Sequence, residues 1–129
     1  MGKNGANGNN VLVVEDEPGI AKAILRTLST EGFEVDIAVN GEIALEMWKR
    51  NNYDLCISDI NMPRMNGIEL FRQLANEYPD AIKKFIFMTG DPTNGIIKAF
   101  LEENGRPCLS KPFLPENLIA VVKKLLVMI

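Results

Sequence analysis

Five side chains suited to ion and phosphate chemistry stand at or just after the ends of short apolar runs. They are Glu15, Asp16, Asp59, Thr89 and Lys111. If these ends met, the carboxylates would repel by roughly 4 kcal/mol per close pair at an effective dielectric of about 20, and a divalent cation would remove that penalty. Carboxylates without His or Cys select a hard ion, and Mg²⁺ fits best. The lysine and threonine would then suit the oxygens of a phosphoryl group.

Other residue types narrow the chemistry further. The chain contains no histidine, so the commonest general base and metal ligand is missing. Any reaction must rest on carboxylates, hydroxyls and amines. The two cysteines, Cys56 and Cys108, both fall in apolar strand-like runs and lack close spacing, which indicates neither a disulfide framework nor a zinc site.

The elements that position these residues alternate along the chain. Five apolar runs predict strands, at 11–15, 33–39, 53–58, 84–89 and 106–110. Between them, apolar residues recur with helical spacing, and Gly32, Pro79 and Gly105 end three of these segments. A last helical segment begins near Pro115. Strands that alternate with helices predict a parallel sheet, whose strand ends lie on one edge.

Strand polarity predicts the order within that sheet. The first and fourth runs are almost continuously apolar, as central strands are, whereas Glu34 and Asp36 alternate with apolar residues in the second run. Pro107 lies in the fifth run and cannot donate to a central ladder. With runs two and five at the edges, right-handed crossovers give the order 2-1-3-4-5, that of an α/β, flavodoxin-like (βα)5 doubly wound sheet. A ligand crevice is expected between strands one and three.

Length and composition indicate one domain and give no support for a nucleic-acid-binding, membrane-spanning or secreted protein. The 129 residues are 47% hydrophobic and 24% charged, and the net charge of −3 gives no reason to expect nucleic-acid binding. No run of about 18 apolar residues predicts a membrane span, and the first residues lack the apolar core of a signal peptide, so we expect a cytoplasmic protein. Residues 1–9 are interpreted as a flexible linker or a tag remnant, and residues 10–129 as the domain.

Four motifs carry a resemblance to a known family. VVEDEP, SDINMPRMNG, FMTGD and LSKPF occur in the order and at the spacing of the receiver domain of two-component response regulators, and the sequence resembles that domain from Asn10 to Ile129. Taken singly, each motif has a plain structural explanation, because acidic residues often cap helices and Thr89 or Lys111 could be ordinary loop and surface residues. The convergence of four strand ends on one edge favours the functional interpretation.

The resemblance implies a role for each residue. Asp59 is expected to be the phosphoacceptor, Asp16 and Asp59 to bind Mg²⁺ with help from Glu15 through water, and Asn61 to offer its backbone carbonyl. The Thr89 and Lys111 side chains are expected to hold the phosphoryl oxygens, and the Lys111–Pro112 bond to be cis. Asn61 and Asp91 resemble positions that tune slow loss of the phosphoryl group to water. The protein would thus be a phosphoacceptor in a phosphorelay and not a conventional enzyme.

Two positions depart from the family pattern. Cys108 stands where the family usually has Tyr or Phe, so the usual aromatic rotamer switch cannot operate in its standard form and a muted response is expected on the face of helix four, strand five and helix five. That face is also where a homodimer would form. Glu15 replaces the more frequent Asp and is expected to change metal affinity little.

The resemblance also indicates a phosphoryl donor, and other classes of protein can be weighed against it. The donor would be the phosphohistidine of a histidine kinase or phosphotransfer domain, and GRPCLSKPF resembles receivers attached behind hybrid histidine kinases, so the domain is expected to act alone or to come from a longer protein. Two other classes of protein are disfavoured. A haloacid-dehalogenase-like phosphatase normally has a second acid where this chain has Asn61, and a flavodoxin-like FMN carrier is disfavoured because the acidic EDEPG would repel FMN. A pseudo-receiver that only docks partners would lack one of the key residues.

Overall fold

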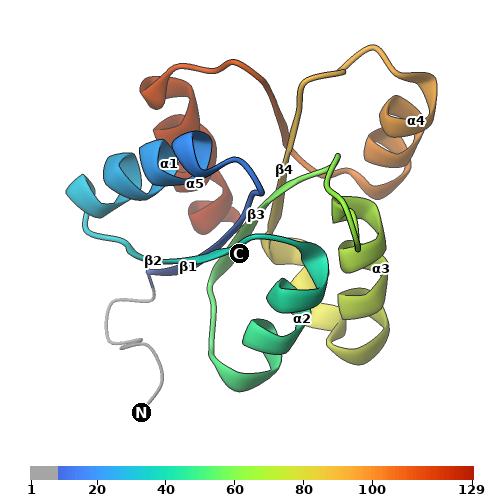
Figure 1. Ribbon diagram of the computed structural model, residues 1–129, viewed down its shortest axis with the longest axis horizontal. Coiled ribbons are helices and arrows are strands. Elements are labelled where there is room, and N and C mark those ends of the chain that lie inside the picture. The colour runs from blue at the N-terminus through green and yellow to red at the C-terminus, as the bar shows by residue number, and fades with distance from the viewer. Residues whose placement is uncertain (1–8) are drawn as a thin grey trace.

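The apolar runs and the helical segments between them form a five-stranded parallel sheet with helices on both faces (Figure 1). The computed structural model describes residues 9–129. The strands are β1 (Asn10–Val14), β2 (Glu34–Ala38), β3 (Leu55–Asp59), β4 (Phe85–Thr89) and β5 (Cys108–Ser110). The helices are α1 (Pro18–Thr30), α2 (Gly41–Arg50), α3 (Gly67–Glu77), α4 (Gly95–Asn104), α5 (Pro115–Met128) and the short 3-10 helix η1 (Pro79–Lys84). The order β2-β1-β3-β4-β5 confirms the predicted topology.

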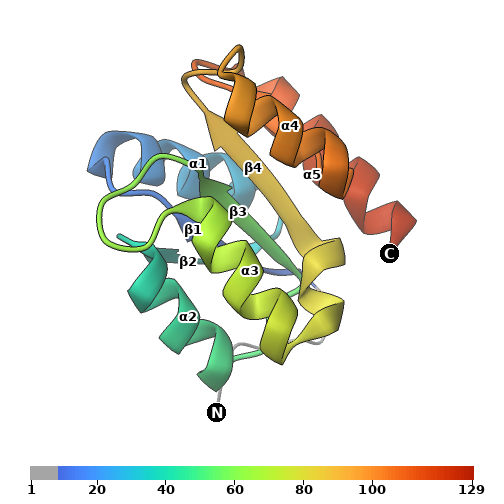
Figure 2. The same ribbon diagram turned by 90° about the vertical axis from the view of Figure 1, so that its right-hand side faces the viewer.

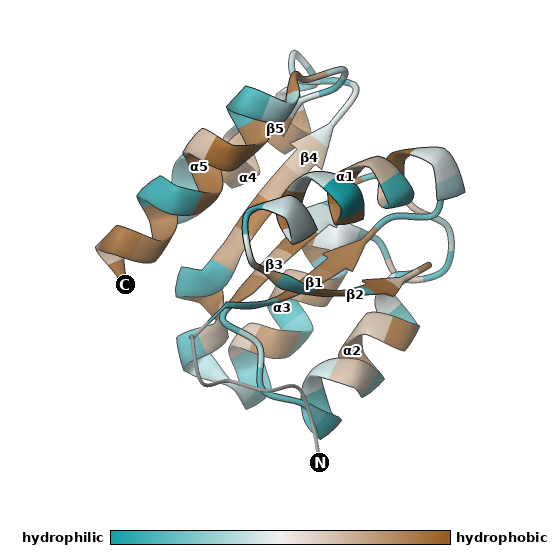
Figure 3. Cartoon of the chain, turned by 90° about the vertical axis from the view of Figure 1, so that its left-hand side faces the viewer, coloured by the Kyte–Doolittle hydropathy of each residue, from teal (hydrophilic) through white to brown (hydrophobic). Residues whose placement is uncertain are grey.

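Two apolar layers hold the helices to the sheet. Successive side chains of a strand point to opposite faces, so Val11 and Val13 of β1 belong to the apolar layer that includes α1 and α5. Leu12 and Val14 belong to the layer that includes α2, α3 and α4. Hydrophobic residues accordingly run along the strands at the centre of the molecule in Figure 3. The two buried layers fix the sheet and therefore the positions of the strand ends.

Burial along the strands follows the predicted order. Every residue of β1, β3 and β4 is buried, whereas β2 and β5 are partly exposed, as edge strands are. The last strand is shorter than predicted and begins at Cys108, because Pro107 has no N–H and only its carbonyl is used, as acceptor from the Phe87 N–H at 2.9 Å.

The 3-10 helix η1 was not predicted from the sequence. It follows α3 directly and leads into β4. The Arg106 guanidinium, which precedes β5, donates to the carbonyl of Ile82 in η1 at 2.8 Å. Burial lowers the pKa of Arg106. This hydrogen bond ties η1 to the segment that enters the edge strand.

Residues 1–8, which make up most of the expected linker or tag remnant, lie outside the described residues. Within residues 9–129, no helix has both the length and the apolar composition needed to cross a bilayer.

Candidate functional site

The carboxyl ends of the strands meet at one edge of the sheet, as predicted. Asp59 at the end of β3 pairs in register with Met88, one residue before Thr89. Thr89 in turn pairs with Ser110, one residue before Lys111, and its carbonyl accepts from the Lys111 N–H at 2.8 Å. Backbone register therefore brings the acid, the hydroxyl and the amine to the same edge.

Three carboxylates gather at the boundary of β1 and β3. Val14 pairs with Ser58, so Glu15, directly after β1, and Asp59, the last residue of β3, lie side by side. Oxygen atoms of Glu15, Asp16 and Asp59 lie within 4.8 Å of one another. Glu15 and Asp59 are buried and Asp16 is exposed. Three carboxylates without imidazole or thiolate fit a hard divalent cation such as Mg²⁺.

The Lys111 ammonium compensates the two buried acids. Its Nζ lies 2.7 Å from Glu15 Oε1 and 3.0 Å from Asp59 Oδ2. Burial raises the pKa of Glu15, although its hydrogen bond from Lys111 acts in the opposite direction. Burial would lower the pKa of Lys111, but its hydrogen bonds to Glu15 and Asp59 outweigh that effect and raise it. The positive charge of Lys111 thus offsets the cost of burying the Glu15 and Asp59 carboxylates.

Backbone amides orient the remaining oxygens. The Asn61 N–H donates to Asp59 Oδ1 at 3.2 Å, and the Glu17 N–H donates to Glu15 Oε2 at 3.1 Å. The Asp91 N–H donates to the buried Thr89 hydroxyl at 3.0 Å. Glu15, Asp16, Asp59, Thr89 and Lys111 therefore lie at this edge. Asn61 and Asp91 lie there too, each in contact with the side chain two residues before it.

A known family matches this fold and site. The family model of the response regulator receiver domain matches residues 11–123. The chain belongs to this family. Receiver domains are signalling modules of two-component systems and not conventional enzymes, which agrees with the expectation from the sequence.

Curated relatives of this receiver are longer proteins. A probable transcriptional regulator, ycf29, of Porphyra purpurea is 38% identical over 120 residues, which are 91% of this chain and 56% of that protein. The aerobic respiration control sensor protein ArcB of Escherichia coli is 34% identical over 89% of this chain and 15% of its own length. The chain thus spans about half of the first relative and a small part of the sensor.

Solved structures agree with the fold. The response regulator TrrA of Thermotoga maritima, in complex with Mg²⁺ and BeF, has a TM-score of 0.79 and 36% identity, over 91% of this chain and 98% of that one. The receiver domain of a histidine kinase from Syntrophus aciditrophicus has a TM-score of 0.84 and 29% identity, over 95% of this chain and 92% of that one.

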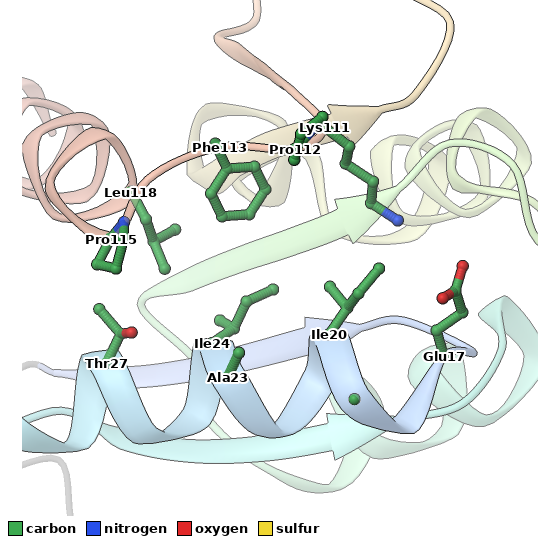
Figure 4. A pocket seen from close by; sticks show the side chains of 11 residues that line it. Glu17, Ile20, Ala23, Ile24, Thr27, Lys111, Pro112, Phe113, Pro115 and Leu118 are labelled. Atoms are coloured by element: carbon green, nitrogen blue, oxygen red, sulfur yellow. The ribbon is translucent and has the colours of Figure 1, made fainter.

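An apolar groove opens beside the receiver's lysine. It lies between α1 and the start of α5 and has a volume of about 490 Å³ (Figure 4). Ile20 and Ala23 line it from α1, Phe113 and Pro115 line it from the opposite side, and Lys111 stands at one end. The Lys111–Pro112 peptide bond at its rim is cis, as the resemblance implied.

Cys108 occupies the position where the family usually has an aromatic residue. It pairs with Phe87 and is half-buried against the apolar layer under α2, α3 and α4. Its sulfur lies 3.8 Å from the Leu109 carbonyl. The muted switch on this face stays a prediction.

The reactivity of Cys108 should depend steeply on pH. Burial raises the pKa of this thiol to about 11, so the protonated form dominates at neutral pH and the thiolate appears only as the pH rises toward that value. We expect alkylation by iodoacetamide at pH 8 to be at least about tenfold slower than in the urea-unfolded chain, from the ratio of thiolate fractions. Peptide mass mapping over time separates Cys108 from Cys56 and measures this rate, and equal rates in both states would contradict the prediction.

Proposed function

We propose that this receiver accepts a phosphoryl group on Asp59 from the phosphohistidine of a histidine kinase or phosphotransfer domain. The arrangement that supports the proposal most is the Asp59 carboxylate itself, which belongs to a three-carboxylate cluster and contacts the Lys111 ammonium at 3.0 Å. A carboxylate nucleophile, a cation-binding cluster and a lysine for phosphoryl oxygens are the parts that phosphoryl transfer needs.

In the reaction, an Asp59 oxygen forms a P–O bond as the P–N bond of the phosphohistidine breaks. The imidazole leaves with the electron pair of that bond. Asp16, Asp59 and the Asn61 carbonyl would hold Mg²⁺, with help from Glu15 through water, and the ion when bound would supply positive charge beside the transferring oxygens. No protein base is needed, because the nucleophile is already ionised, so the lack of histidine in the chain is no obstacle.

Lys111 and Thr89 would hold the phosphoryl group. The Lys111 ammonium already donates to Glu15 Oε1 and Asp59 Oδ2, and its one remaining N–H group can donate to a phosphoryl oxygen. The Thr89 hydroxyl accepts from the Asp91 N–H, which leaves its own hydrogen for donation. The acyl phosphate would later be lost slowly to water, at a rate that Asn61 and Asp91 tune from the mouth of the site.

The decisive experiment follows the mass of the protein. Incubation with Mg²⁺ and acetyl phosphate should add one phosphoryl group, and that group should be absent in Asp59→Asn.

The groove beside Lys111 gives the donor a place to dock. A phosphohistidine can reach Asp59 only if its own protein covers this edge, and the apolar wall of Ile20 and Phe113 begins at Lys111 (Figure 4). We therefore propose that a helix of the donor that carries the phosphohistidine packs into the groove. Burial of its apolar side chains there would supply affinity, and Lys111 would meet the phosphoryl group at the rim.

A charged residue in the groove should slow phosphoryl transfer from protein donors but not from small-molecule donors. In Ile20→Glu, we expect transfer from a phosphorylated histidine phosphotransfer domain to slow by on the order of tenfold, because a carboxylate would face the partner's apolar side chains. Phosphorylation by acetyl phosphate should stay within about twofold, since the small donor makes no use of the groove. Radiolabelled transfer kinetics measure both.

The matched control is Ile96→Glu. Ile96 is an apolar residue on α4 that is 80% exposed and does not line the groove. Equal slowing of protein-donor transfer in both variants would contradict docking at the groove.

A further inference from the structure

Three helices of this receiver begin with the same two residues. Asn40–Gly41, Asn66–Gly67 and Asn94–Gly95 start α2, α3 and α4, and each asparagine side chain accepts a backbone N–H of the first turn. A Cβ at Gly95 would meet nothing within 4 Å, whereas a Cβ at Gly41 would lie 2.3 Å from the Met65 carbonyl oxygen. The glycine of α2 is therefore required by a contact with another part of the chain and not by the cap.

That contact joins α2 to the loop between β3 and α3. The Gly41 N–H donates to the Met65 carbonyl at 3.0 Å. The Met65 side chain packs in part against the apolar layer beneath α2 and α3. Figure 2 shows this loop passing beside the first turn of α2. The absence of a side chain at Gly41 lets the two backbones approach closely enough for the hydrogen bond.

An ion pair between Glu42 and Arg64, the neighbours of Gly41 and Met65, joins the same two segments. The Arg64 Nη2 and Nε atoms lie 2.7 Å and 2.8 Å from Glu42 Oε1. Both side chains are more than half exposed, so the pair alone contributes little stability. Arg64 has a φ of +67°, a left-handed conformation that is unfavourable for a residue with a Cβ. The ion pair and the Gly41–Met65 hydrogen bond together therefore hold the tip of the loop in a conformation that its sequence does not favour by itself.

The loop begins directly after Asp59, the proposed phosphoacceptor. The Gly67 N–H donates to the Ile60 carbonyl at 3.1 Å and closes the loop directly beyond Asp59. Asn61 is the second residue of the loop, and its N–H contacts Asp59 Oδ1. Where the loop lies thus decides where the backbone of Asn61 lies relative to the carboxylate cluster.

We propose that Gly41 and Glu42, at the start of α2, are positioning residues for reaction at Asp59. They fasten Met65 and Arg64, and thereby hold the Asn61 backbone where it can complete the cation site. The inference rests on the proposed function in so far as Asn61 serves the metal. That contacts from α2 fix the position of the loop is a separate physical claim, and it can be tested in the protein without metal.

The first test compares Gly41→Ala with Gly95→Ala. Both place alanine at the first position of a helix behind an asparagine cap, so any gain in helix propensity is shared. In Gly41→Ala the loop must move away from the new Cβ. We expect faster hydrogen exchange of the amides of residues 61–66 without Mg²⁺, and Mg²⁺ affinity lower by on the order of tenfold, as a displacement near 1 Å can cause.

The second test separates the ion pair from a general charge effect. A long-range field would weaken Mg²⁺ binding in Glu42→Lys and strengthen it in Arg64→Glu, because the two changes have opposite sign. Loss of the fastening would weaken Mg²⁺ binding in both, by no more than about fivefold for an exposed pair, and the double exchange would restore it. Isothermal titration calorimetry measures each affinity.

Two results would overturn the proposal. One is equal loop exchange and equal Mg²⁺ affinity in the two alanine variants, and the other is opposite effects in the two charge variants. If Gly41→Ala does not fold, the charge variants decide alone. A wild-type protein that gains no phosphoryl group would overturn the proposed function instead, and the exchange comparison would still show whether α2 holds the loop.

Discussion

Asp59→Asn should abolish phosphorylation of this receiver, while wild-type protein incubated with Mg²⁺ and acetyl phosphate gains one phosphoryl group in intact mass. The reason is chemical, since the amide oxygen of asparagine is neutral and a far weaker nucleophile than the carboxylate it replaces. The substitution keeps the size of the side chain and an oxygen for the Lys111 ammonium, which lies 3.0 Å from Asp59 Oδ2. The loss should therefore reflect the chemistry and not a collapse of the site.

The control for this experiment is Asp54→Asn. Asp54 lies just before β3, the same strand that ends in Asp59, and its Oδ2 accepts from the Asn10 N–H at 2.7 Å, a bond that an asparagine oxygen can also accept. That variant should be phosphorylated like the wild type. Phosphorylation of Asp59→Asn on any residue would show that the acceptor has been wrongly assigned, and the exposed Asp16 would be the first residue to examine.

The sequence predicted the sheet because its strands differ in environment. The runs that form β1 and β4 are almost continuously apolar, whereas the run that forms the β2 edge alternates and Pro107 lies at the other edge. The same proline made the last strand shorter than predicted. The helix η1 was missed because PDAIKK carries no helical spacing of apolar residues, and its contact with Arg106 joins segments far apart in the chain.

The site residues could be predicted for a related reason. Parallel strands end at one edge, so residues that follow strands gather there whatever the loops do. The sequence could not show that Lys111 would contact both Glu15 and Asp59, since these contacts span 96 and 52 residues. It also gave no sign that Gly41 would face Met65, although the repeated Asn-Gly pair at three helix starts was visible.

Lys111→Met and Asp16→Asn should change Mg²⁺ affinity in opposite directions. The Lys111 ammonium lies against two of the three carboxylates that can hold the ion, so it repels a divalent cation there. Removing it should tighten Mg²⁺ binding, whereas removing the Asp16 charge should weaken it. Each change should be on the order of tenfold, the effect of about 1.4 kcal/mol, which is well below the Coulomb energy of a close pair.

The same two variants should separate metal binding from phosphoryl transfer. At Mg²⁺ concentrations that saturate each protein, Lys111→Met should still be phosphorylated about 100-fold more slowly than wild type, because a donor to the transferring oxygens has been lost. Asp16→Asn should recover most of its rate under those conditions, since its defect lies in binding the ion. Lys98→Met, which removes an exposed lysine on α4, is the control and should change neither quantity. Weaker Mg²⁺ binding in Lys111→Met would contradict the repulsion argued from the geometry, and a full transfer rate in that variant would remove Lys111 from the proposed mechanism.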